Sequence, residues 1–329
     1  MENRATRFLI AVFVVLFVAV AAVGLVGREL ARPGPLAAER TVVIPNGTST
    51  KAMAALLARE GVLHSARMFE LAARVSGFAP TLKAGEYVFE AGVSPRQVLS
   101  KLAFGHTASR SMTLPEGLTV KQVLAMVEGD KTLSGAARPI PEEGRMFPDT
   151  YTFTHGTPRA KLLEQMTVRM DQELADAWAA RDGNIPLASA EELLILASIV
   201  QKEAANDAEM PLVAGVFANR LRKGMLLQSD PTVMYGADMV GNDITSKELK
   251  EANPFNTYQN KGLPPTPIAN PGRAALQAAA RPASTEALFF MAKPDRSGHV
   301  FTTTYAEHQK AVKAYWSAYN QRKQESVKP

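Results

Sequence analysis

One carboxylate, Glu203, has the setting expected of a group that transfers protons. It lies in the stretch LASIVQKEAANDAEMP, which begins at Leu196. Ser189 and Glu192 have the spacing of a capping box, which predicts a helix that starts at about Ala190. At about 100° per residue, Glu203 then projects beside the apolar face that this helix would bury. Desolvation there would raise the pKa of the carboxyl and keep it protonated near neutral pH, as a general acid requires.

The alternative for Glu203 is a structural role. A glutamate at a frayed helix end turns to solvent, or it pairs with a cation such as Arg220 or Arg222. The residues alone leave both interpretations open.

The chain contains few other patterns that are typical of catalysis. Its five histidines show no metal-ligand spacing, and no H-E-x-x-H, G-x-S-x-G, Walker A or G-x-G-x-x-G pattern occurs. The absence of cysteine excludes disulfides, thiolate catalysis and cysteine-based metal sites. We therefore expect no metal and no cofactor. Acid catalysis by a carboxylate remains, with polar and aromatic side chains of 225–236 and 253–272 to bind a substrate rich in hydroxyl and amide groups.

Composition indicates a globular protein with room for two domains. The 329 residues are 46% hydrophobic and 21% charged, and the formal net charge is +5. Lysine and arginine are scattered and form no basic stripe, so nucleic acid is not a predicted partner.

A membrane anchor is predicted near the amino terminus. Residues 8–26 read FLIAVFVVLFVAVAAVGLV and contain no charged side chain, and their length as a helix approaches the roughly 30 Å hydrocarbon core of a bilayer. A cleaved signal peptide is the alternative, but this run is longer than the usual apolar region of one. We expect a cytoplasmic tail at 1–7, a transmembrane helix at 8–26, a stalk at 27–40 and an exported carboxy-terminal part.

A short internal sequence repeat predicts small units of strand, turn and helix after the stalk. The segments IPNGTSTK (44–51) and LPEGLTVK (114–121) share the pattern apolar-Pro-x-Gly-x-Ser/Thr-x-Lys. Ser49, Ser94 and Thr119 are placed as helix N-caps, and Pro95 falls at a first helical position. We assign a first α/β module to 41–110.

Longer helical patterns characterise the second half of the chain, at 158–180 and 190–223. The Gly-, Pro- and Asn-rich segment 253–272 is predicted to be a rigid loop that binds ligand, or alternatively a surface connection stiffened by proline. Two short strands around a turn at 295–298 and a closing helix complete a mixed α+β domain at 111–329.

Seven segments together resemble the endolytic murein transglycosylases, the MltG or YceG-like family. They occur in the family's order and are EGRMFPDTYTF, LASIVQKEA, VFANRL, LLQSDPTVMYG, NPFNTY, GLPPTPIANPG and GHVFTTTYAEH. The resemblance implies a single-pass inner-membrane protein whose module at 41–110 is LysM-like and whose catalytic domain at 111–329 faces the periplasm. It also implies peptidoglycan glycan strands as substrate and peptidoglycan synthases as partners.

The resemblance also bears on the catalytic acid, which in this family is a glutamate in the block matched by ASIVQKEA. Many members read Glu-Lys-Glu where this chain reads Gln201-Lys202-Glu203. If the acid belonged to the first position, the protein would be inactive. The helical register favours Glu203, so both approaches agree on that residue.

The expected reaction is the lytic cleavage of the bond between N-acetylmuramic acid and N-acetylglucosamine. Glu203 would protonate the glycosidic oxygen and then activate the muramyl 6-hydroxyl, which yields a 1,6-anhydro end without a second carboxylate. Six residues are candidates for holding the sugars: Asn219, Gln228, Asp230, Tyr235, Asn256 and Tyr258. Each could instead be a turn or cap residue, and Asp230 in particular could be the N-cap of a helix whose first residue is Pro231.

Two other functions stay open. One is a non-catalytic, membrane-anchored scaffold that binds peptidoglycan. The other is a true hydrolase that uses Asp230 or Asp149 as its base.

Overall fold

Two compact units make up the chain in the computed structural model. The structure describes residues 4–45, 47–105, 109–239, 244–245, 247–295 and 297–325. Unit 1 comprises Met1–Ser111 with Thr132–Ser134 and Thr152–Thr157, and unit 2 comprises Met112–Lys131, Gly135–Tyr151 and Pro158–Pro329. Parts of two predicted segments, residues 1–3 of the tail and 326–329 of the catalytic domain, lie outside the described residues.

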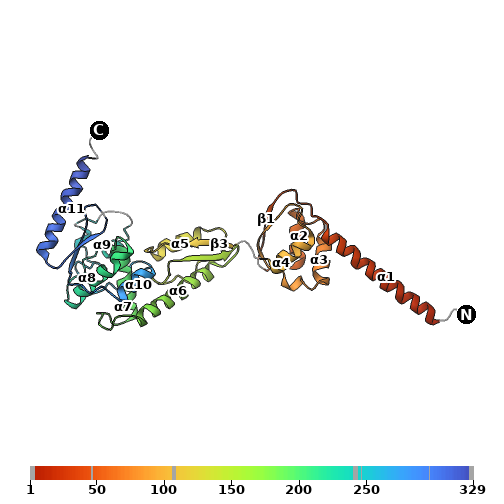
Figure 1. Ribbon diagram of the computed structural model, residues 1–329, viewed down its shortest axis with the longest axis horizontal. Coiled ribbons are helices and arrows are strands. Elements are labelled where there is room, and N and C mark those ends of the chain that lie inside the picture. Colours follow the sequence, from red (N-terminus) through yellow and green to blue (C-terminus); the bar gives the residue numbers. More distant parts are fainter. Residues whose placement is uncertain are drawn as a thin grey trace. The chain divides into compact units, whose positions relative to one another are not determined.

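Unit 1 combines helices with a two-stranded antiparallel sheet (Figure 1). Its elements are α1 (Arg4–Ala31), β1 (Arg40–Ile44), α2 (Thr50–Arg59), α3 (Ala66–Val75), η1 (Ala79–Thr81), β2 (Gly85–Phe89) and α4 (Pro95–Phe104). In the sheet, Arg40 faces Phe89 and Ile44 faces Gly85. Phe69, Tyr87 and Phe89 are fully buried between this sheet and the helices. The predicted alternation of strand and helix is confirmed here, whereas the LysM-like assignment stays a prediction.

The predicted N-caps are confirmed. Ser49 accepts a hydrogen bond from the Ala52 backbone N–H at the start of α2, and Ser94 closes a full capping box at α4, whose first residue is Pro95. Thr119 forms a second full capping box in unit 2. These caps satisfy donors that a helix start otherwise leaves without partners.

The membrane span is not confirmed. Residues 8–26 lie within α1, but across the part of the chain that the structure describes, no helix combines the length and the apolar character needed to cross a bilayer. The anchor therefore stays a prediction.

Unit 2 is mainly helical and contains one β-hairpin, and a further two-stranded sheet has residues in both units. Strand β3 (Ser109–Thr113), which begins in unit 1, pairs with β4 (Thr150–Thr154), and β5 (Phe289–Ala292) pairs antiparallel with β6 (His299–Thr302). The helices are α5 (Val120–Gly129), α6 (Arg159–Ala179), α7 (Ala190–Glu203), η2 (Asp207–Glu209), α8 (Met210–Arg222), α9 (Asp230–Gly236), η3 (Glu248–Lys250), α10 (Arg273–Ala280) and α11 (Tyr305–Glu325). The predicted mixed α+β class and the final hairpin and helix are confirmed.

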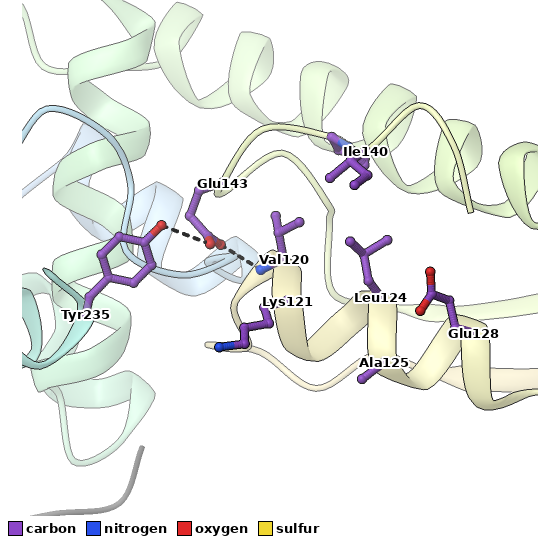
Figure 2. A pocket seen from close by; sticks show the side chains of 9 residues that line it. Val120, Lys121, Leu124, Ala125, Glu128, Ile140, Glu143 and Tyr235 are labelled. Atoms are coloured by element: carbon purple, nitrogen blue, oxygen red, sulfur yellow. Dashed lines mark hydrogen bonds between the residues drawn. The ribbon is translucent and has the colours of Figure 1, made fainter. Parts of the chain in front are cut away.

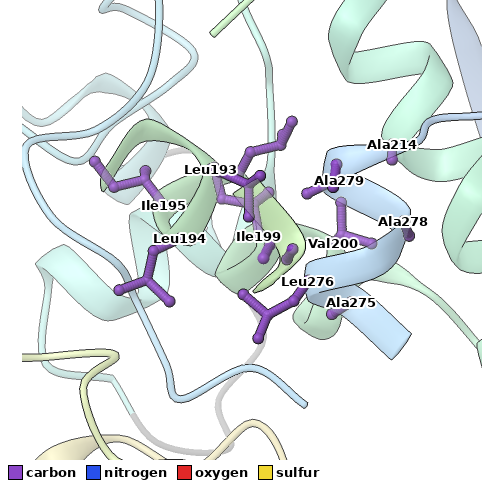
Figure 3. Close-up of a cluster of buried hydrophobic side chains, with 14 of the residues drawn as sticks. Leu193, Leu194, Ile195, Ile199, Val200, Ala214, Ala275, Leu276, Ala278 and Ala279 are labelled. Atoms are coloured by element: carbon purple, nitrogen blue, oxygen red, sulfur yellow. The ribbon is translucent and has the colours of Figure 1, made fainter. Parts of the chain in front are cut away.

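Helix α7 forms the centre of the core of unit 2. Every residue from Leu193 to Val200 is buried, and Figure 3 shows Val200 against the α10 side chains Leu276 and Ala279. The buried Ser198 hydroxyl donates to the Ile195 carbonyl and accepts from the Ile268 N–H at 3.0 Å. A helix that is apolar on all sides must be surrounded by protein, and these contacts hold its carboxyl end in one place.

Two helix predictions need correction. The pattern at 190–223 is not continuous, because α7 ends at Glu203 and α8 begins at Met210, with Pro211 in its first turn. The capping box at α7 is only half formed. Ser189 accepts from the Glu192 N–H as predicted, but the Glu192 side chain accepts from the Ala188 N–H instead of closing the box.

The loop at 253–272 is partly a core element. Asn270 is fully buried, its side chain accepts from the Met146 N–H and donates to the Leu118 carbonyl, both at 2.8 Å, and its carbonyl accepts from the Gly117 N–H. One asparagine thereby joins three segments that are distant in sequence. The interpretation of this loop as a mere surface connection is therefore wrong for its last third.

We expect Asn270→Ala to lower the free energy of unfolding by about 1–3 kcal/mol, because it leaves the buried Met146 N–H without an acceptor. Chemical denaturation of the variant and the wild type measures this difference. Asn260→Ala is the matched control, since the exposed Asn260 donates only to carbonyls of its own loop, and its effect should stay within about 0.5 kcal/mol. Equal losses for the two variants would contradict the role given to Asn270.

Candidate active site

Glu203 is the last residue of α7, where the apolar helix reaches the edge of the core. Its Oε1 accepts a hydrogen bond of 2.6 Å from the Ser229 hydroxyl. Ser229 is itself fully buried, and its backbone N–H donates to the Thr257 hydroxyl at 3.0 Å. The carboxylate is thus held by a short chain of polar groups that runs from the 228–230 turn to the 253–272 loop.

The environment of Glu203 favours its neutral form. The pKa of Glu203 is raised to about 7, chiefly by burial and also by the nearby charge of Asp230, and the Ser229 bond and the charge of Arg220 offset this rise only partly. A carboxyl with this pKa exists in both protonation states near neutral pH, so it can give and take a proton. The expectation of a desolvated acid agrees with this arrangement.

A pocket of about 490 Å³ opens beside Glu203. Three of the predicted substrate-binding residues, Gln228, Asp230 and Tyr258, line it together with Arg220. The rest of the lining comes from the carboxy-terminal hairpin and α11, namely Phe289, Phe290, Met291, Ala292, His299, Tyr305 and His308, in addition to Leu227. The pocket therefore combines one acid, several polar groups and an aromatic wall.

Arg220 is a structural cation beside the acid. It is 7% exposed, and its guanidinium donates to the backbone carbonyls of Leu288, Leu226 and Leu227. It also lies 5.2 Å from the centre of the Phe289 ring. No ion pair joins Glu203 to Arg220 or Arg222 among the described residues, so the structural pairing considered for Glu203 is not formed.

Asp230 is the first residue of α9, and Ser229 occupies the N-cap position that was considered for Asp230. The Tyr258 hydroxyl donates to Asp230 Oδ1 at 2.5 Å. Burial, followed by this bond and the Asp230 charge, raises the pKa of Tyr258 above its ordinary value. Asp230 and Tyr258 thus form a hydrogen-bonded pair in the lining of the pocket.

Gln228 has an unusual backbone for a residue with a side chain, with φ of 51°. Its N–H donates to the Thr257 carbonyl and its side-chain oxygen accepts from Arg220 at 3.3 Å. A left-handed conformation in a non-glycine residue is costly and needs such support. The turn presents Gln228 and Asp230 on either side of Ser229.

The other three predicted substrate-binding residues, Asn219, Asn256 and Tyr235, lie outside this pocket. Asn219 donates to the carbonyls of Thr285 and Ala287, and it accepts from Arg222. Asn256 is fully buried and donates to carbonyls of 248–251, while its oxygen accepts from the Tyr258 N–H. Both asparagines support the backbone of the site.

Tyr235 lines a second pocket, of about 530 Å³, with Glu143 and residues of α5. Figure 2 shows the Tyr235 hydroxyl donating to Glu143, whose other oxygen accepts from the Val120 N–H at 2.9 Å. Burial raises the pKa of Glu143 and that of Tyr235, the latter to about 12. Glu143 therefore caps α5 and holds Tyr235.

Gln201 is not part of the pocket lining. Its side-chain oxygen accepts from the Gly272 N–H at 2.9 Å, which ties α7 to the start of α10. A glutamate oxygen could accept the same bond, so this position needs an acceptor and not an acid.

The wall formed by β5, β6 and α11 was missed as part of the site. Its residues belong to the segment GHVFTTTYAEH and the strand before it, which carry no periodic or metal-binding signal that marks a pocket. Within the described ranges, no group of three or more acidic residues and histidines is placed to hold a metal ion.

The raised pKa of Glu203 predicts a pH-dependent stability. The proton that Glu203 holds in the folded chain stabilises it fully below about pH 4.5, and this contribution is lost as the pH rises through 7. The loss is on the order of 3 kcal/mol, and Glu203→Gln abolishes it. We therefore expect the variant to gain thermal stability over the wild type at pH 8 and much less at pH 5. Glu164→Gln, at an exposed position of α6, is the control and should follow the wild type at both pH values; a variant difference independent of pH would contradict the assignment.

Comparison with known proteins places the chain in one family. The YceG-like family matches residues 42–314. An endolytic murein transglycosylase of Bacillus subtilis (strain 168) is 30% identical, with 91% of each chain aligned. A protein of the same name from Streptococcus pneumoniae (strain D39) is 26% identical over 83% of this chain, which spans only 57% of that relative. A crystal structure of a YceG-like protein from Listeria monocytogenes covers 83% of this chain and 98% of its own, with 29% identity and a TM-score of 0.52. The chain therefore belongs to the YceG-like family.

Proposed function

We propose that this protein is an endolytic lytic transglycosylase that cuts the glycan strands of peptidoglycan. The observation that carries the proposal is the carboxyl of Glu203, held by Ser229 at the edge of a pocket with a pKa of about 7. The relatives in Bacillus and Streptococcus, which are named endolytic murein transglycosylases, support the same substrate class.

The proposed reaction uses Glu203 twice. Its protonated form gives the proton to the glycosidic oxygen, the bond from the muramyl anomeric carbon to that oxygen breaks, and an oxocarbenium-like centre forms. The resulting carboxylate then takes the proton of the 6-hydroxyl on the same sugar. The 6-oxygen bonds to the anomeric carbon, which gives a 1,6-anhydro end and regenerates the acid. No water is consumed.

Three pocket residues are proposed to hold the sugars. Gln228, Asp230 and Tyr258 contribute amide, carboxylate and phenol groups to the lining beside Glu203, and the exposed ring of Tyr305 offers an aromatic surface on which a sugar ring can pack. Asn219 and Asn256 would act indirectly, through the backbone that they support.

Two alternatives are distinguished by their products. A hydrolase with Asp230 as base is supported by the presence of that carboxylate in the same pocket, whereas the exposed Asp149 does not line it. Hydrolysis would add water and leave a reducing end in place of the anhydro end. A non-catalytic scaffold would bind strands and cut none.

We infer further that the chain is anchored in the inner membrane by α1, with its catalytic domain in the periplasm. Large apolar side chains on α1, among them Phe8, Phe13 and Phe17, are each more than 65% exposed and would be covered by lipid. Anchoring would hold the active pocket near newly made strands and near the synthases that make them.

The first test is cleavage of uncrosslinked glycan strands by the full-length protein, with the fragments read by mass spectrometry. We expect anhydro-muramyl ends from the wild type and at least a thousandfold slower release from Glu203→Gln, since the reaction has no other acid in the proposed position. Gln201→Glu is the matched control on the same helix and should cut at the wild-type rate.

The products of this test separate the candidates. Reducing ends that carry an added water would replace the proposal by a hydrolase. Strands that are bound and left intact by a folded wild type would favour the scaffold.

Membrane anchoring is tested by fractionation of cells that make the full chain and a chain that starts at Ala31. We expect only the full chain to resist extraction of membranes by carbonate and to need detergent for release. Recovery of both chains in the soluble fraction would contradict the anchor.

A further inference from the structure

An acidic residue and a histidine that the proposed mechanism leaves unused form a pair at the edge of the catalytic pocket. Glu209 ends the short η2 helix between α7 and α8, and His299 begins β6. His299 lines the same pocket as Glu203. We propose that His299 is a substrate-binding residue whose Nε2 accepts a hydrogen bond from a sugar hydroxyl, and that Glu209 is the positioning residue that fixes its tautomer. This inference rests on the proposed function and names a contact within it.

Two hydrogen bonds fix His299 to one carboxylate. The backbone N–H of His299 donates to Glu209 Oε1 at 2.7 Å, and Nδ1 lies 2.8 Å from Glu209 Oε2. The side chains are only 12% and 15% exposed, so little water competes for these bonds. A carboxylate that binds the backbone and the ring of one residue leaves the ring little freedom to rotate.

The surrounding residues support the same arrangement. Gly298 has φ of 146°, and a Cβ at this position would collide with the Glu209 carboxylate, so a side chain here would push Glu209 away. Phe290 and Phe301 pack edge-on against the imidazole at ring distances of 5.3 and 6.3 Å. The ring is therefore held by the carboxylate, by the close approach of a glycine and by two aromatic neighbours.

The protonation of the pair follows from its geometry. Burial alone would raise the pKa of Glu209, but the bonds from the ring and backbone of His299 outweigh it and hold the pKa below its ordinary value. Glu209 is thus ionised and can only accept, so the neutral form of the imidazole carries its proton on Nδ1. Nε2 is left as an acceptor with no protein partner among the described contacts.

An acceptor of this kind matches the chemistry of a glycan. Each sugar carries several hydroxyl donors, and a fixed imidazole nitrogen binds one of them without the entropy cost of ordering a flexible side chain. Gln228 and Asp230 line the same pocket, so a sugar would meet polar groups from two separate parts of the chain.

The test combines three variants of the full-length protein in detergent. His299→Phe keeps a ring for Phe290 and Phe301 to pack against and removes both nitrogens. Glu209→Gln keeps the size of the positioning residue and removes its charge. Glu173→Gln is the matched control, because Glu173 is a carboxylate of similar burial, 11% exposed, that pairs with Arg273 in the same unit and lies outside the pocket.

We expect His299→Phe to lower kcat/KM for strand cleavage about tenfold, mainly through KM, as the loss of one bond to substrate predicts. Glu209→Gln should lower kcat/KM less. The double variant should have the same kcat/KM as His299→Phe alone, since Glu209 acts through the histidine. Glu173→Gln should leave kcat and KM unchanged.

NMR of the imidazole nitrogens, in protein labelled at histidine, gives a second readout. A purely structural role of His299 would leave these resonances unchanged on addition of glycan. The wild type should show the proton of His299 on Nδ1, and Glu209→Gln should shift part of it to Nε2. In Glu203→Gln, which binds strands without cutting them, added glycan should shift the Nε2 resonance.

The outcomes separate the inference from the function on which it rests. A folded His299→Phe variant with unchanged kcat and KM, or a wild-type proton on Nε2, overturns the inference even if cleavage occurs. Absence of cleavage by the wild type, together with a glycan-induced shift at His299, overturns the proposed reaction and leaves the binding contact intact.

Discussion

The structure of the site depends on a single constraint, which is that a carboxylate ends a helix buried on every side. Helix α7 is covered by α10 and its neighbours, so Glu203 cannot move its backbone away from the core. The cost of desolvating the acid is offset by one hydroxyl, that of Ser229, and not by an ion pair. An ion pair would favour the charged form, whereas a hydroxyl donor leaves both protonation states accessible. The helix core and the acidity of its last residue are therefore consequences of the same packing.

Around this carboxylate, each neighbouring segment is held by a different type of contact. The strained turn at Gln228 is supported by Arg220 and Thr257, the 253–272 loop by buried asparagines, and the hairpin by the pair of Glu209 and His299. Arg220 contributes to two of these, because its guanidinium binds carbonyls on both the 226–227 segment and the hairpin side at Leu288. Such a site assembles only when the whole unit has folded, since its members are separated by up to about a hundred residues along the chain.

Local features of the molecule were predictable from sequence, and long-range ones were not. The caps at Ser49, Ser94 and Thr119 depend on residues within one turn, and periodicity and spacing reveal them. The position of Glu203 beside the apolar face of its helix follows equally from the helical register. By contrast, nothing near Asn219 in sequence indicates that its amide binds the Thr285 carbonyl, or that Tyr235 faces Glu143, about ninety residues away. The aromatic wall of the pocket was missed for the same reason, because its residues reach Glu203 through tertiary packing alone.

The bond between Gln201 and Gly272 has a consequence for how relatives are recognised. The position requires an oxygen that accepts from a backbone N–H, and amide and carboxylate oxygens meet that requirement equally. Glutamine and glutamate can therefore both keep this bond. A search pattern that demands both acids of the Glu-Lys-Glu sequence would discard chains such as this one because of a residue that does not line the pocket at all.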